Sequence, residues 1–114
     1  MSELHGIVLY DIELGECLNG VWTNQHNKGE IRNEIAKRTK PSEKNKDDEI
    51  AGVYKSSYIE IDNKIYLGDL TVEVEQGVYS FSWAYEDGNK LFFGIGYRMN
   101  EHQITVYYWW GENK

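Results

Sequence analysis

Residues 78–110 read VYSFSWAYEDGNKLFFGIGYRMNEHQITVYYWW, and this stretch decides the fold class. Large apolar side chains recur at every second position along 78–85, 91–98 and 102–110, which is the period that a β-strand imposes. Asp87-Gly88 separates the first two runs, and this dipeptide accepts the positive φ angles of a tight hairpin turn. The stretch therefore predicts consecutive antiparallel strands joined by short turns.

The same alternation continues upstream of this stretch. We expect further strands at 4–14, 18–26, 49–61 and 64–75. Successive hairpins of this kind close into a barrel or stack as a sandwich. We therefore expect an all-β fold, a small antiparallel up-and-down barrel of about eight strands, in a single domain that covers residues 1–114.

Glu30–Lys37 fits two structures, because Ile31 and Ile35 suit one face of a helix as well as a strand. A short helix near 30–38 is therefore one of two open alternatives. The stretch after it, 38–48, is polar and holds the only proline, so we expect a loop there.

Composition is that of a globular domain, with 40% hydrophobic and 27% charged residues among 114. No apolar run approaches the roughly 20 residues that span a membrane, and the first residues lack the pattern of a signal peptide. The single cysteine, Cys17, cannot form a disulfide within the chain. These features predict a cytoplasmic protein without a membrane partner.

The net charge of −7 is unevenly distributed. The stretch 28–46 holds seven of the twelve basic residues and only three acidic ones, so the remainder of the chain is strongly acidic. Phosphate contacts require clustered Lys and Arg, and we therefore expect no nucleic-acid partner. The basic stretch itself is either a solvated loop or a surface for an acidic partner.

Residues for catalysis or metal binding are sparse. His5, His26 and His102 have no spacing that suggests a shared metal, and a lone cysteine excludes sulfur-rich zinc sites. Cys17 and His26 are the only conceivable nucleophile and base, and nothing in their flanking residues supports that pair. We expect no cofactor, no metal and no enzymatic activity.

Four short motifs resemble those of avidin-type barrels. Leu18–Asn24 matches L-x-G-x-W-x-N, of which G-x-W is shared with lipocalins, and Gly52–Ser56 is similar to a G-x-Y-x-S/T strand. Trp83–Tyr85 and Phe92–Gly94 fall at the spacing of the W-x-F and F-x-G elements. The chain therefore resembles the avidin and lipocalin group of small, calycin-type barrels.

This resemblance implies a set of ligand-binding residues inside the barrel. Asn24, Tyr54 and Ser56 would contact the polar group of a ligand, and the aromatic walls would come from Trp22, Trp83 and Phe92. Biotin is not implied, because Lys90 stands where a hydroxyl is expected and no later strand supplies the aspartate that avidins use.

Two arrangements of the aromatic strands remain open. If Trp83 and Phe92 line the lumen, then Phe93, Ile95 and Tyr97 point outward, and we expect a homo-oligomer through that face. If the bulkier set points inward instead, the lumen is filled.

Two classes of function follow. The first is a noncatalytic binding protein with an aromatic-lined lumen for a small apolar or aromatic ligand. The alternative is a protein-binding module, an inhibitor or immunity-type protein that acts through its acidic surface and the 38–48 loop. A faint similarity of Gly20–Asn24 and Gly94–Gly96 to barrel-shaped inhibitors of bacterial cysteine proteases keeps this protein partner in view.

Overall fold

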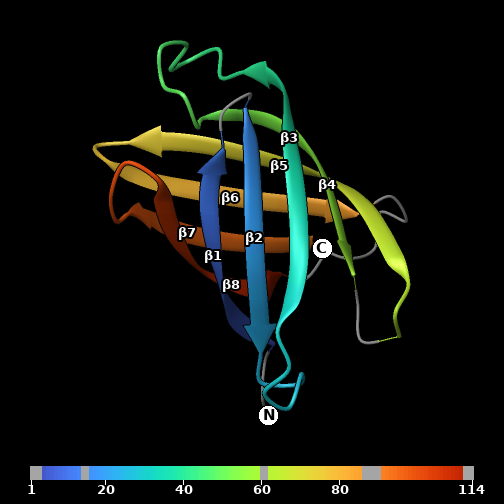
Figure 1. Cartoon of the computed structure of the whole chain (residues 1–114). Coiled ribbons are helices and arrows are strands. Elements are labelled where there is room, and N and C mark those ends of the chain that lie inside the picture. The colour runs from blue at the N-terminus through green and yellow to red at the C-terminus, as the bar shows by residue number, and fades with distance from the viewer. Residues whose placement is uncertain (1–3, 14–15, 60–61, 86–90, 112–114) are drawn as a thin grey trace.

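The computed structural model describes residues 4–13, 16–59, 62–85 and 91–111 and contains eight strands (Figure 1). In chain order these are β1 (His5–Glu13), β2 (Cys17–Asn24), β3 (Arg32–Pro41), β4 (Gly52–Ile59), β5 (Ile65–Glu75), β6 (Val78–Tyr85), β7 (Leu91–Arg98) and β8 (Gln103–Gly111). Each strand pairs antiparallel with its neighbour in sequence, and β8 pairs with β1, so the sheet is a closed barrel. The predicted all-β barrel of about eight strands is confirmed.

The segment that fitted both a helix and a strand is strand β3, so the alternative of a helix near 30–38 is wrong. Glu34 and Ala36 are buried while Ile35 and Lys37 are exposed, which is the period of two of a strand. Ile35 therefore lies on the outer face of the barrel, and its spacing from Ile31 reflects no helical stripe. β3 also continues into the expected loop as far as Pro41, where a proline is tolerated because the strand ends.

The described part of the chain contains no helix long and apolar enough to span a membrane. The predicted Asp87-Gly88 turn and Lys90 lie outside the described residues.

The aromatic strands adopt the first of the two arrangements. Trp83 is 4% exposed and opposes Phe92 across the β6–β7 ladder, with both side chains directed inward. Phe93, Ile95 and Tyr97 consequently face outward and are exposed.

Aromatic rings fill the centre of the barrel. The Tyr10 and Phe81 ring centroids are 5.8 Å apart, and those of Phe81 and Trp83 are 5.6 Å apart, with both pairs stacked. Glycine makes room for them, since a Cβ at Gly20 would lie 2.7 Å from the Tyr10 ring. The two ends of the barrel differ from this filled centre and from each other.

One end of the barrel is closed by the segment between β3 and β4. Ile50 from this segment is fully buried, and its carbonyl oxygen accepts a hydrogen bond from the Tyr54 hydroxyl at 2.5 Å. The Arg38 guanidinium donates to the carbonyl oxygens of Asp48 and Ala51 and holds the segment against the barrel. The interior is therefore accessible chiefly from the opposite end.

Candidate functional site

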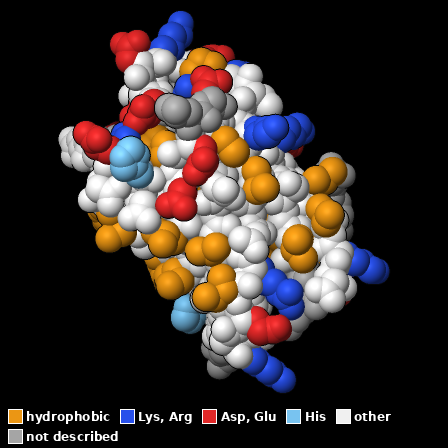
Figure 2. Space-filling model, viewed as in Figure 1, with side chains coloured by type: hydrophobic (Ala, Val, Ile, Leu, Met, Phe, Trp, Pro, Cys, Tyr) orange, Lys and Arg blue, Asp and Glu red, His pale blue; other side chains and the backbone are white. Residues whose placement is uncertain are grey.

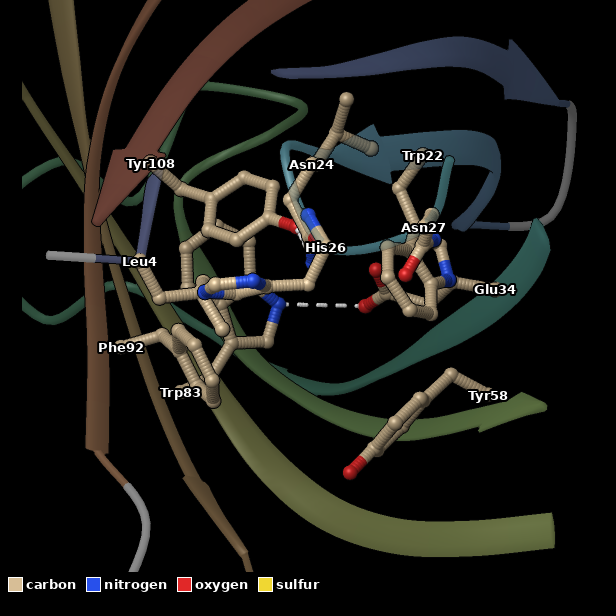
Figure 3. Close-up of a pocket in the computed structure, with 11 residues that line it drawn as sticks. Leu4, Trp22, Asn24, His26, Asn27, Glu34, Tyr58, Trp83, Phe92 and Tyr108 are labelled. Atoms are coloured by element: carbon tan, nitrogen blue, oxygen red, sulfur yellow. Dashed lines mark hydrogen bonds between the residues drawn. The ribbon is translucent and has the colours of Figure 1, made fainter. Parts of the chain in front are cut away.

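A cavity of about 160 Å³ lies at the end of the barrel where β2 runs into β3 (Figure 3). It is lined by Leu4, Val8, Trp22, Asn24, His26, Asn27, Glu34, Tyr58, Trp83, Phe92 and Tyr108. An engineered apolar cavity of roughly 150 Å³ holds benzene, so this volume fits a ligand built around a single ring.

Five aromatic side chains from five different strands form the walls of the cavity. The rings of Trp22 and Tyr58 meet edge to face with centroids 6.0 Å apart. Tyr108 makes the same kind of contact with Trp83 at 6.0 Å and with Phe92 at 5.8 Å. Edge-to-face contacts fix the rings relative to one another, and the walls are therefore held in place before any ligand arrives.

The carboxyl group of Glu34 forms the floor. It accepts hydrogen bonds from the Tyr10 hydroxyl at 2.8 Å, the Ser56 hydroxyl at 2.6 Å and the Trp83 indole nitrogen at 3.1 Å. Figure 3 shows the last of these bonds crossing the cavity floor. Burial raises the pKa of this carboxyl above its ordinary 4.5, and the three hydrogen bonds oppose that rise.

The rim is built by the turn that follows β2. The Asn24 side chain donates to the Tyr108 hydroxyl at 3.1 Å and accepts from the His26 backbone nitrogen at 2.9 Å. The backbone of Asn27 donates to the Asn24 carbonyl oxygen and accepts from the Glu30 nitrogen. These bonds hold the Asn27 side chain over the cavity, where it is 4% exposed.

Two buried donors on residues that line the cavity have no partner in the described part of the chain. They are Nε1 of Trp22, whose side chain is 7% exposed, and Nδ2 of Asn27. Nearly all buried polar groups in folded proteins are hydrogen-bonded, so each unpaired one requires an explanation. An acceptor atom within reach of either donor would satisfy it.

The structure brings together four of the six ligand-binding residues predicted from sequence. Trp22, Asn24, Trp83 and Phe92 line the cavity. Ser56 does not line the cavity, but its hydroxyl donates a hydrogen bond to Glu34, which forms the cavity floor. Tyr54 points to the closed end of the barrel, where its hydroxyl binds the Ile50 carbonyl oxygen.

Sequence reasoning missed Glu34, Asn27, Tyr58 and Tyr108. Tyr58 and Tyr108 each lie an even number of positions from an inward-facing residue on the same strand. Their inward orientation can therefore be predicted once one inward-facing residue of that strand is known. Glu34 lies in the segment that fits both a helix and a strand. If the segment is taken as a strand, the alternation of its side chains places the Glu34 carboxylate inside the barrel.

The described residues support neither a metal site nor a catalytic pair of Cys17 and His26. Within them, no group of three or more His, Cys, Asp or Glu side chains is placed to hold a metal ion. Strand β2 runs from Cys17 to Asn24 and is about 23 Å long at roughly 3.3 Å per residue, so Cys17 and His26 lie at its two ends and form no catalytic pair.

Comparison of the chain with protein-family models gives no matching family, and neither the curated proteins nor the solved structures give a match. What the structure defines is a closed, eight-stranded antiparallel barrel, compatible with a calycin-like fold, around a buried aromatic cluster. Such a barrel is compatible with ligand binding.

The raised pKa of Glu34 generates a stability prediction for the empty protein. Because the folded state favours the neutral carboxyl, the unfolded chain loses this proton first as the pH rises above 4.5. The unfolding free energy of the wild type should therefore fall relative to that of E34Q from pH 4.5 upward, until the pKa of the folded state is passed. Gln suits the site, because its oxygen can accept from Ser56 and Trp83 while its amide faces the Tyr10 hydroxyl.

Urea unfolding of both proteins between pH 4 and 8 measures this difference (about 1.4 kcal/mol for each unit by which the pKa is raised). A difference in unfolding free energy that does not change with pH would contradict the assignment.

Proposed function

We propose that the protein is a noncatalytic binding protein that takes one small, ring-sized ligand into the cavity beside Glu34. The observation that carries this proposal is the pair of unpartnered buried donors, Trp22 Nε1 and Asn27 Nδ2, in an aromatic-walled cavity. Each unpaired buried donor destabilises the empty fold by roughly 1–3 kcal/mol. A site that tolerates this penalty and keeps an open volume is organised for an occupant.

The shape of the barrel supports the same proposal. One end is closed by Ile50 and the centre is filled by stacked rings, whereas the other end keeps a cavity of about 160 Å³ between its rings. A few fixed polar groups within an apolar pocket are the usual composition of a small-molecule site.

The resemblance to avidin-type and lipocalin-type barrels supports a ligand in the lumen without identifying it. In avidins, the equivalents of Asn24, Tyr54 and Ser56 converge on one polar group of the ligand. Here the Tyr54 hydroxyl is engaged at the closed end and the Ser56 hydroxyl is bound to Glu34. We therefore expect no tight binding of biotin.

Asn27→Ala separates binding from folding. The substitution removes an unpaired buried donor and leaves the backbone bonds of the turn in place, so the empty protein should be as stable as the wild type or more stable. Ligand affinity should nevertheless fall about tenfold, the equivalent of one hydrogen bond. Native mass spectrometry of freshly purified protein identifies a bound ligand, and calorimetry with that ligand measures the change.

Asn33→Ala is the matched control, because Asn33 is exposed on β3 and lies outside the cavity. It should change neither property. If N27A lowers stability and leaves affinity unchanged, the Asn27 amide is structural and the proposed site is wrong.

We further propose that a second copy of this chain is the partner of the apolar outer face. This face comprises Ile7, Leu9, Phe93, Ile95, Tyr97 and Tyr107, all of which are exposed. Ile95 opposes Tyr107 across β7–β8, and Tyr107 opposes Ile7 across β8–β1, so the face is continuous. Figure 2 shows hydrophobic side chains across the middle of the molecule in the view that presents β1 and β2.

The lack of charge on this face is compatible with a copy of the same chain as the occupant. Two chains of net charge −7 repel each other, and close approach is least unfavourable through surfaces without charged side chains. The apolar outer face is such a surface, and a two-fold symmetric contact would bury it on both chains at once. Each Å² of apolar area removed from water contributes roughly 25 cal/mol.

Ile95→Lys should therefore convert a dimer or larger assembly into monomer in sedimentation experiments at tens of micromolar, because it places two like charges in the contact. Leu67→Lys is the matched control on β5, outside the apolar outer face, and should leave the assembly intact. A wild-type protein that sediments as a monomer at these concentrations would overturn this proposal.

A further inference from the structure

Among the described residues that line the cavity, Glu34 carries the one carboxyl group, and no group of opposite charge lies beside it. Neither Lys nor Arg lines the cavity in the described ranges, and His26 at the rim is exposed. The inward-facing arginines on the same strand are engaged elsewhere, Arg32 by Glu30 at 3.3 Å and Arg38 by Glu16 at 2.7 Å. A buried carboxylate without a cation is unfavourable, since taking a charge out of water is compensated only by a partner of opposite charge or by many hydrogen bonds.

The hydrogen bonds to Glu34 leave room for one more donor. A carboxylate has about four acceptor positions. Ser56 and Trp83 occupy two positions on Oε2, and Tyr10 occupies one on Oε1. One position on Oε1 therefore remains for an N–H group of a ligand.

The walls favour positive charge as well. The faces of aromatic rings carry negative potential and attract cations, most strongly when the rings are those of Trp and Tyr. Trp22, Tyr58, Trp83 and Tyr108 surround the same volume that Glu34 closes from below. Figure 3 shows these rings around the Glu34 carboxyl, with Asn27 and Trp22 on one side of it and Trp83 on the other.

Building on the proposed function, we propose that the ligand is a small organic cation: a protonated amine carried on a single ring that also bears a hydrogen-bond acceptor such as a hydroxyl group. The ammonium group donates to Glu34 and lies against the ring faces. The acceptor of the ligand meets Trp22 Nε1 or Asn27 Nδ2, which are two of the buried donors without a partner among the described residues. An anion would face the Glu34 carboxyl with no Lys or Arg in the described lining to offset it, and a neutral ligand would form no ion pair with that carboxyl.

Binding of a cation is coupled to the protonation of Glu34. An ammonium group pairs with the ionised form of Glu34, whose pKa is raised by burial, so the affinity for a cation rises with pH over the range in which this carboxyl loses its proton. The other titratable groups that face the cavity are Tyr10 beneath Glu34, Tyr58 and Tyr108 in the walls, and His26 at the rim. H26Q separates any contribution of the rim imidazole from that of Glu34.

Three probes of the same size but different charge test the proposal by calorimetry. They are tyramine (a cation), 4-ethylphenol (its neutral near-isostere) and 4-hydroxyphenylacetate (an anion). The wild type should bind tyramine about tenfold more tightly than 4-ethylphenol and should bind the anion most weakly. E34Q should bring tyramine and 4-ethylphenol within about twofold of each other. E75Q removes the same charge at an exposed position outside the cavity and should retain the preference for tyramine.

A second measurement needs no variant. Titrations of the wild type in two buffers of different ionisation enthalpy should show protons released when tyramine binds and none when 4-ethylphenol binds. Equal affinity for these two probes, or a preference for tyramine that survives in E34Q, would overturn the cationic ligand while leaving a small-molecule site in place. If none of the three probes binds the wild type, the ring-sized ligand of the proposed function fails as well.

Discussion

The buried carboxyl of Glu34 is the constraint on which the rest of the structure depends. A carboxyl inside a barrel must be hydrogen-bonded, and here the donors come from three other strands: Tyr10 on β1, Ser56 on β4 and Trp83 on β6. These bonds link opposite sides of the barrel through its interior. They fix where the stacked rings of the centre end and where the cavity begins.

The two ends of the barrel illustrate how the same interior can be filled or left open. At the closed end, Ile50 enters the lumen and Arg38 and Tyr54 bond to the backbone that carries it. At the open end, the turn after β2 folds over the rim but contributes Asn27, whose Nδ2 is left without a partner. Closure by an apolar plug needs no ligand, whereas closure by an unpaired amide favours an occupant that accepts hydrogen bonds.

The strands were predictable from sequence, whereas much of the site was not. Alternation along 78–110 is strong because rings recur at every second position, and this pattern indicated that Trp83 and Phe92 could share the lumen. Alternation does not reveal which end of a barrel a residue occupies. That depends on the register and on the plug at Ile50, so Tyr54 was grouped with Asn24 although they lie at opposite ends. Glu34 was missed because a glutamate is usually exposed, and only partners distant in sequence make its burial tolerable.

Burial raises the pKa of the Glu34 carboxyl in the empty cavity, and a cationic ligand should stabilise its ionised form. The most direct test is NMR of the protein labelled with ¹³C at the glutamate carboxyl carbon, with the Glu34 signal assigned by its loss in E34Q. The carboxyl should titrate above 4.5 in the empty protein, and its signal should move toward the position of an ionised carboxylate when saturating tyramine is added. A Glu34 signal that titrates at or below 4.5 in the empty protein, and does not respond to tyramine, would contradict the account.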